Sequence, residues 1–150
     1  MDWNLMLSTE LWSRVGLCLL CGAMVGFERK MNVKPIGIRT CTLVCLGTMT
    51  FVYLGEQIGG AQDPTRVLGQ VATGIGFLGA GAIVQNAGMV VVGMTSAAVV
   101  WVLAAVGAAI GFGKFELGLS VSLVTVFVLS GLNWADALAE AKNNRSSKSS

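Results

Sequence analysis

Long apolar runs separated by short polar islands dominate the pattern along the chain. Five such runs are each roughly 17–20 residues long, close to the length that an α-helix needs to cross a bilayer. They cover residues 11–27, 40–58, 67–86, 93–111 and 115–132. The pattern therefore predicts an all-α fold, a polytopic membrane bundle of about five transmembrane helices.

The polar islands predict how this bundle is oriented. The loop after the first run and the segment after the fifth are rich in Lys and Arg, whereas the N-terminus and the second loop carry mainly acidic residues. Cytoplasmic loops of membrane proteins carry the excess of basic residues. We therefore expect residues 1–133 to form the transmembrane domain, with the N-terminus outside. Residues 134–150 are expected to form a short cytoplasmic tail with a disordered end.

The third run, residues 66–86, combines small and polar residues at helical spacing. Arg66, Gln70, Thr73, Phe77 and Gly81 fall on one face, and the first three of them give it a polar edge. The neighbouring face has no side chain larger than a methyl group and consists of Gly69, Ala72, Gly76 and Ala80. Small residues let membrane helices approach closely, and polar groups within a bilayer are costly. We expect this helix to be the structural centre of the bundle and a functional surface.

Two further spans carry local packing signals. Residues 22–26 (GAMVG) and 107–111 (GAAIG) are GxxxG patterns, which favour close contact with a neighbouring helix. Arg14 follows Glu10 by one helical turn near the outer end of the first span. We expect these two side chains to form an ion pair.

Composition agrees with a membrane protein and narrows its function. Hydrophobic residues make up 54% of the chain, charged residues 12%, and the mean hydropathy is +0.72. Soluble domains usually contain about a quarter charged residues. A net charge of +2 is too small to indicate a nucleic-acid partner. The chain has no histidine, paired carboxylates or activated-serine pattern, so we expect neither enzymatic activity nor a cofactor.

Two patterns resemble binding motifs in an unsuitable context. Residues 74–79 (GIGFLG) match GxGxxG, but a dinucleotide site needs a preceding strand and a βαβ unit. Within a span, these glycines favour tight packing or a local break of the helix. Four cysteines leave a metal site open as an alternative, although buried cysteines usually behave as small hydrophobic residues. They are Cys18, Cys21, Cys41 and Cys45.

Six polar residues near the spans have two interpretations. They are Glu28, Arg29, Arg39, Arg66, Gln70 and Thr73. In one interpretation they set topology and form interhelical hydrogen bonds, and in the other they form a binding or partner-docking surface. Carboxylates lie only near the span ends, which argues against a dedicated pore for divalent cations. The topology puts residues 28–39 inside and Arg66 outside, which predicts two separate sites.

Four segments resemble the signatures of the MgtC/SapB family of bacterial inner-membrane proteins. They are residues 26–29 (GFER), 34–40 (KPIGIRT), 63–81 (DPTRVLGQVATGIGFLGAG) and 93–101 (GMTSAAVVW), in the family's order and spacing. The resemblance implies a five-span bundle, a role in adaptation to low magnesium and, in pathogens, survival inside macrophages. It also implies regulation of other membrane machinery, including ATP synthase, and not magnesium transport. Long members carry a cytosolic ACT-like domain, in place of which this chain has a short tail.

The leading hypothesis is a non-enzymatic, multi-pass inner-membrane protein that acts by helix contact with other membrane proteins. Its expected partners are the lipid bilayer, membrane proteins such as ATP synthase, and a second copy of the chain. One alternative is a transporter or channel whose glycine-rich third helix is broken, and another is a metal-binding protein that uses the cysteines. The candidate functional and packing residues are Glu28, Arg29, Arg39, Thr40, Arg66, Gln70, Thr73, Gly74, Gly76, Gly79, Gly81 and Trp101.

Overall fold

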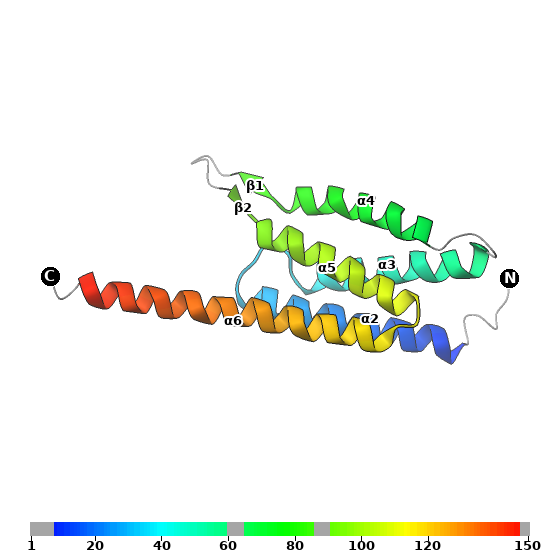
Figure 1. The fold of residues 1–150 in the computed structure, drawn as a ribbon, viewed down its shortest axis with the longest axis horizontal. Helices are drawn as coiled ribbons and strands as arrows, with labels where there is room; N and C mark the ends of the chain where they lie inside the picture. The colour runs from blue at the N-terminus through cyan, green and yellow to red at the C-terminus, as the bar shows by residue number, and fades with distance from the viewer. Residues whose placement is uncertain (1–7, 60–64, 86–90, 148–150) are drawn as a thin grey trace.

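A computed structural model describes residues 8–59, 65–85 and 91–147, which form five α-helices and one pair of two-residue strands. The helices are α2 (Thr9–Met31), α3 (Ile38–Gly59), α4 (Thr65–Gly81), α5 (Met94–Gly111) and α6 (Phe115–Ser147). Strands β1 (Val84–Gln85) and β2 (Val91–Val92) pair antiparallel between α4 and α5. Consecutive helices run in opposite directions (Figure 1). The prediction of an all-α bundle with five helices is confirmed.

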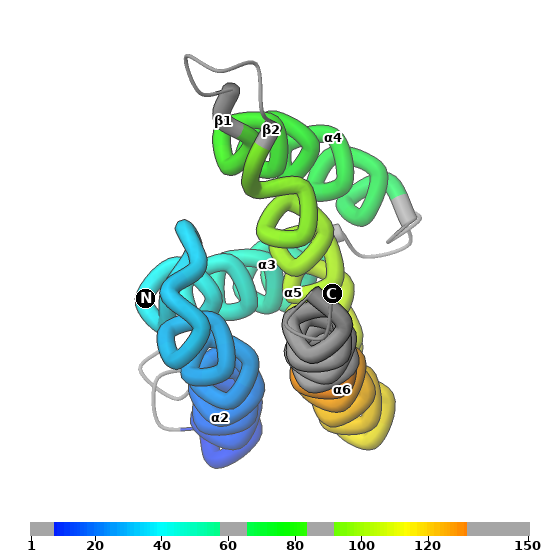
Figure 2. Tube along the Cα trace, turned by 90° about the vertical axis from the view of Figure 1, so that its left-hand side faces the viewer, coloured from blue at the N-terminus to red at the C-terminus, as the bar shows by residue number. Residues whose placement is uncertain are grey.

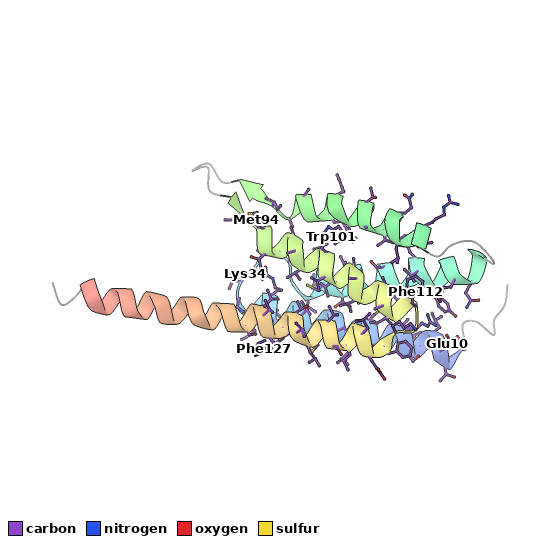
Figure 3. The ribbon with its side chains drawn as sticks, in the orientation of Figure 1. Glu10, Lys34, Met94, Trp101, Phe112 and Phe127 are labelled. Atoms are coloured by element: carbon purple, nitrogen blue, oxygen red, sulfur yellow. The ribbon has the colours of Figure 1, made fainter. Side chains whose placement is uncertain are left out.

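The helices have the length and composition of a membrane protein. Among the described residues, α2, residues 38–57 of α3, and α5 are long and apolar enough to cross a bilayer. Helix α4 has 17 residues, and the first part of α6, Phe115–Gly131, is a shorter apolar helix. Glu10 and Phe112 lie at one end of the bundle, and Lys34 and Met94 lie at the other (Figure 3). Which end faces the cytoplasm stays a prediction.

Helix α4 differs from the predicted third span in two ways. It is continuous over its 17 residues, so of the two alternatives for its glycines, tight packing or a local break, this segment shows no break. It also ends at Gly81, before the predicted end at residue 86, which lies outside the described residues. The N–H of Ala82 donates to the carbonyls of Leu78 and Gly79, and the strand pair follows. Backbone pairing therefore replaces the last helical turn that hydropathy alone predicts.

A glycine fixes the path from β2 into α5. Gly93 has φ +94°, in the left-handed region that favours glycine. A Cβ at this position would also collide with the carbonyl oxygen of Ala82. Both observations explain why the chain turns at this residue.

Helix α6 continues past the predicted end of the fifth span at residue 132. Residues 133–147 contain no glycine or proline and include several alanines, so they favour continuation of the helix. The predicted domain boundary after residue 133 falls within α6, and the segment expected to be disordered is helical through Ser147. Residues 148–150 lie outside the described part of the chain. The assignment of residues 134–150 to a cytoplasmic tail stays a prediction.

Helix α3 packs against α2 through the first GxxxG pattern. A Cβ on Gly22 would lie 2.6 Å from the Cα of Thr42, and a Cβ on Gly26 would lie 2.5 Å from the Cα of Ile38. Atoms cannot approach this closely, so the backbones meet only because these residues are glycines. The predicted close contact is confirmed.

The second GxxxG pattern brings α5 against α3, further along the same helix. A Cβ on Gly107 would collide with the carbonyl oxygen of Cys45, and a Cβ on Gly111 would lie 2.7 Å from the Cβ of Val52. Helix α3 therefore packs closely against both α2 and α5. Figure 2 shows α4 at the edge of the bundle, beside α5. The expectation that residues 66–86 form the structural centre is wrong, because α3 and α5 occupy that place.

Candidate functional site

Helix α4 is attached to the bundle near its two ends and also in its middle, where Ile75 is 7% exposed and belongs to the hydrophobic core. Near its start, Val67 lies against α3, where a Cβ on Gly55 would be 2.7 Å from Val67 Cγ2. Near its end, Gly79 packs on α5, and a Cβ there would lie 3.7 Å from the Cβ of Ala97. Between these contacts, α4 leaves one face uncovered and borders a groove on another.

The uncovered face of α4 consists of Gly69, Thr73, Gly76, Phe77 and Ala80, all of them exposed. Phe77 is 83% exposed. A Cβ added to Gly69 or Gly76 would meet no atom within 4 Å among the described residues. The Thr73 hydroxyl donates to the carbonyl of Gly69 at 3.0 Å, so it is satisfied within its own helix. Of the small face that predicted tight packing, Gly69, Gly76 and Ala80 therefore lie open, whereas Ala72 is half-buried.

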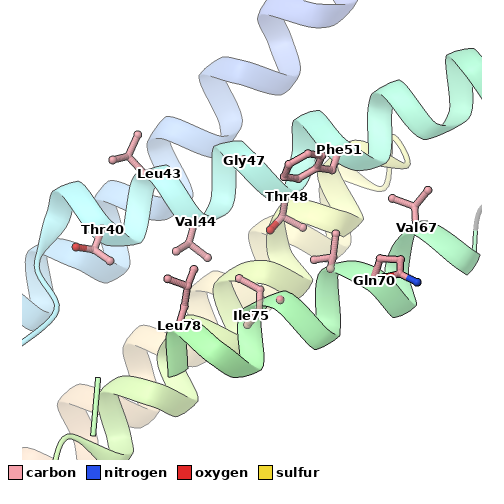
Figure 4. A pocket seen from close by; sticks show the side chains of 12 residues that line it. Thr40, Leu43, Val44, Gly47, Thr48, Phe51, Val67, Gln70, Ile75 and Leu78 are labelled. Atoms are coloured by element: carbon pink, nitrogen blue, oxygen red, sulfur yellow. The ribbon is translucent and has the colours of Figure 1, made fainter. Parts of the chain in front are cut away.

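A groove with a volume of about 620 Å³ lies between α3 and α4 (Figure 4). From α3 it is lined by Thr40, Leu43, Val44, Gly47, Thr48 and Phe51. From α4 it is lined by Val67, Gln70, Val71, Gly74, Ile75 and Leu78. The lining is almost wholly apolar, with Thr40, Thr48 and Gln70 as its polar side chains. The volume falls within the range of about 300–1,000 Å³ typical of small-molecule sites.

The groove joins two groups of predicted site residues. Thr40 from the start of α3 and Gln70 from α4 line the same space, although the topology argument predicted two separate sites. Arg39 and Arg66 are exposed and are not among the lining residues, and each lies in the first turn of its helix. Gly74 also lines the groove, and a Cβ there would meet nothing within 4 Å.

Glu28 and Arg29 lie elsewhere, buried at the end of α2 against the start of α5. Arg29 is 2% exposed, and its Nη2 donates to the hydroxyl of Ser96 at 2.6 Å. Glu28 is 7% exposed and accepts a hydrogen bond from Nδ2 of Asn32 at 2.8 Å. Burial of a guanidinium is costly unless it is hydrogen-bonded, so this contact compensates part of that cost and joins the end of α2 to the start of α5. Neither residue lines the groove.

Arg14 forms a polar cluster whose extent the sequence did not reveal. Its Nη2 lies 2.5 Å from Oε1 of Glu10, which confirms the predicted ion pair. Its Nη1 donates to the carbonyl of Gly111 and lies 3.7 Å from Oε2 of Glu56. The guanidinium carbon also lies 4.7 Å from the centroid of the Tyr53 ring. Arg14 thus joins α2 to the ends of α3 and α5, and only the partner in its own helix could be inferred from spacing.

The four cysteines are buried, free and split between two parts of the core. Cys18, Cys21 and Cys45 belong to one hydrophobic cluster, and Cys41 belongs to the other. In the described residues, no group of three or more His, Cys, Asp or Glu side chains is arranged to hold a metal ion. The geometry therefore does not support the four-cysteine alternative. Trp101, the remaining predicted residue, is 52% exposed on α5 (Figure 3).

Comparison with known proteins yields a family and several relatives. The model of the MgtC family matches residues 15–138. The chain is 38% identical over 139 residues to protein SrpB of Synechococcus elongatus, an alignment that covers 84% of this chain and 76% of SrpB. It is 41% identical over 111 residues to protein MgtC of Brucella abortus strain 2308, with 74% of this chain and 45% of that protein covered.

A third relative bears a name that mentions transport. The chain is 42% identical over 122 residues to the "Putative magnesium transporter YhiD" of Escherichia coli K12, covering 74% of this chain and 54% of that protein. The chain thus spans about half the length of the MgtC and YhiD relatives. No solved structure matches the chain.

Proposed function

The chain belongs to the MgtC family, and from this premise we propose that it is a non-enzymatic, multi-pass protein of the bacterial inner membrane. It regulates other membrane proteins by direct helix contact during adaptation to low magnesium. ATP synthase is the partner that the family resemblance implies, and in a pathogen the same activity serves intracellular survival.

The observation that carries this proposal is the uncovered face of α4. The glycines of the two GxxxG patterns in α2 and α5 are covered by α3, whereas a Cβ on Gly69 or Gly76 would meet nothing within 4 Å in the described part of the chain. Glycine lowers helix stability relative to alanine, so exposed glycines in mid-helix carry a cost without an internal packing benefit. A helix from another membrane protein would supply that benefit, because small residues permit close approach.

The distribution of basic residues between the two ends of the bundle supports the proposed orientation. Lys34 lies at the end of the bundle opposite Glu10 (Figure 3), as five alternating crossings require. The basic connection between α2 and α3 then lies in the cytoplasm, and the N-terminus lies outside. In this orientation α4 begins at the outer surface and ends at the cytoplasmic surface.

The test compares two glycine-to-leucine substitutions. Gly76→Leu places a large side chain on the uncovered face of α4, and Gly16→Leu places the same side chain on α2, where it also meets no atom within 4 Å. Both variants are expected to insert normally. Gly76→Leu is expected to lose co-purifying ATP synthase or other membrane proteins, and Gly16→Leu to retain them. Equal recovery of partners with both variants would argue against regulation through α4.

A second candidate function is transport of a small ion or solute. The observation that favours it is the groove between α3 and α4, with Gln70 on its wall. Purified protein in liposomes is the direct test, with Gln70→Ala as the variant and Thr73→Ala, on the uncovered face, as its control. Magnesium flux that Gln70→Ala abolishes and Thr73→Ala preserves would replace the regulatory proposal.

A further inference from the structure

The groove between α3 and α4 has walls built on one repeating pattern. On α3, Leu43, Gly47 and Phe51 follow one another at intervals of four residues, and on α4, Gln70, Gly74 and Leu78 do the same. Residues four apart lie on the same face of a helix, so each set forms one row along the groove. One helical turn before these rows stand Arg39 and Arg66.

Because α3 and α4 run antiparallel, the two arginines stand at opposite ends of the groove (Figures 1 and 4). Both are exposed, and neither forms a hydrogen bond or ion pair with the described part of the chain. The Arg39 end is the more basic one, since exposed Lys30 and Lys34 lie in the same connection. The α3 helix has no acidic residue in its first turn, whereas Glu56 lies near the opposite end.

The length and lining of the groove suit a hydrocarbon chain. From Thr40 to Phe51 the α3 wall measures roughly 17 Å at 1.5 Å per residue. An acyl chain laid along this wall would contact almost wholly apolar side chains. Leu43 and Phe51 are 66% and 65% exposed, so the wall is open to the bilayer.

We propose that this groove holds one acyl chain of an anionic phospholipid whose headgroup is bound by Arg39. The apolar rows contact the chain, and the guanidinium of Arg39 pairs with the phosphate, as arginine does in phosphate recognition. In the orientation proposed above, Arg39 faces the cytoplasmic leaflet, where anionic lipids attract basic residues. The lipid would fill the space between α3 and α4.

This proposal is separate from the regulatory one, because the groove and the uncovered face lie on different sides of α4. Gly74 lines the groove, while Gly76 belongs to the uncovered face. Substitutions at these two glycines therefore test the two proposals independently.

The experiment measures which phospholipid the full-length protein retains. Wild type and variants are reconstituted with equal amounts of phosphatidylglycerol and phosphatidylcholine of identical acyl chains, extracted in mild detergent and weighed by native mass spectrometry. The wild type is expected to retain one phospholipid, with about a fivefold preference for phosphatidylglycerol, the effect of one basic residue near an anionic headgroup. Arg39→Gln is expected to remove that preference, and Arg39→Lys to keep most of it.

A groove-filling variant tests the site of the acyl chain. Gly47 and Gly74 both line the groove, and a Cβ on either would meet nothing within 4 Å, so Gly47→Leu with Gly74→Leu fills the space without a clash. This double variant is expected to retain no phospholipid, while Gly16→Leu behaves like the wild type. Circular dichroism checks that the double variant keeps its helices, and if it does not, Arg39→Gln alone decides the outcome.

Three results would overturn the proposal. They are a wild type that retains no phospholipid, a wild type that retains both headgroups equally, and a folded double variant that retains as much lipid as the wild type. A dimer that is present in the wild type and lost in the double variant, without bound lipid, would identify a second copy as the occupant instead.

Discussion

Arg14 shows how one polar side chain connects helices that are distant in sequence. Its contact with Glu10 adds little, because that carboxylate is 61% exposed and exposed ion pairs contribute about 0–1 kcal/mol. Its hydrogen bond to the Gly111 carbonyl, 97 residues away, is buried. A buried carbonyl left without a donor costs about 1–3 kcal/mol, so this bond dominates the contribution of Arg14.

Arg14→Met keeps the size of the side chain and removes its donors. We expect it to lower the free energy of unfolding by about 1–3 kcal/mol, measured by reversible denaturation in mixed micelles. Lys114→Met, at an exposed position, serves as the control and is expected to change the free energy of unfolding by less than about 0.5 kcal/mol. Equal stability of the two variants would show that the hydrogen bond from Arg14 to the Gly111 carbonyl does not stabilise the protein.

At the residue scale, the sequence predicts local pairs and misses distant ones. Glu10 and Arg14 are one turn apart, and helical spacing alone brings them together. Tyr53, Glu56 and Gly111 reach the same guanidinium only because α2, α3 and α5 pack in a particular register. No pattern in one sequence encodes that register directly. The same limit applies to the bond between Arg29 and Ser96.

At the scale of single helices, glycines play two opposite roles. Those at 22–26 and 107–111 are covered by α3, while Gly69 and Gly76 of α4 are open. The sequence patterns of the two groups look alike, because small residues at helical spacing indicate close approach without naming the partner. This is why α4 could be mistaken for the centre of the bundle. The end of α4 was also missed, because apolar residues that follow Gly81 pair as strands instead of extending the helix.

Alanine substitutions distinguish these two roles, because they are expected to lower stability at a covered glycine and to raise it at an open one. Gly107→Ala pushes a methyl group into the carbonyl of Cys45, and overpacking of this kind costs about 1–3 kcal/mol. Gly76→Ala meets open space, so the higher helix propensity of alanine is expected to stabilise the protein by about 0.5–1 kcal/mol. Thermal unfolding in detergent compares the two. A loss of stability in Gly76→Ala would mean that this face is covered.

At the scale of the whole molecule, the number of helices and their alternation follow from hydropathy and charge. Apolar runs of sufficient length predict the helices, and the uneven distribution of Lys and Arg predicts an odd number of crossings. The groove between α3 and α4 could not be predicted in this way. It depends on how α3 and α4 pack, because its walls come from two helices whose relative placement no pattern in the sequence specifies.

The predicted orientation can be tested with single cysteines at the two ends of the bundle. The native cysteines are buried, so they are expected to react slowly. In intact cells, a membrane-impermeant thiol reagent is expected to label Glu10→Cys and to spare Lys34→Cys until the membrane is opened. Labelling of both variants in intact cells, or of Lys34→Cys alone, would contradict an external N-terminus.

The central claim is that the uncovered face of α4 contacts another membrane protein, and photo-crosslinking tests it most directly. A photoreactive phenylalanine analogue replaces Phe77, which is 83% exposed, or Phe127, which is 78% exposed on α6 and serves as the matched control. After illumination of native membranes, Phe77 is expected to form a covalent product with a defined membrane protein such as a subunit of ATP synthase, and this product disappears with Gly76→Leu. Phe127 is expected to yield lipid adducts. Lipid adducts alone at both positions would contradict the account.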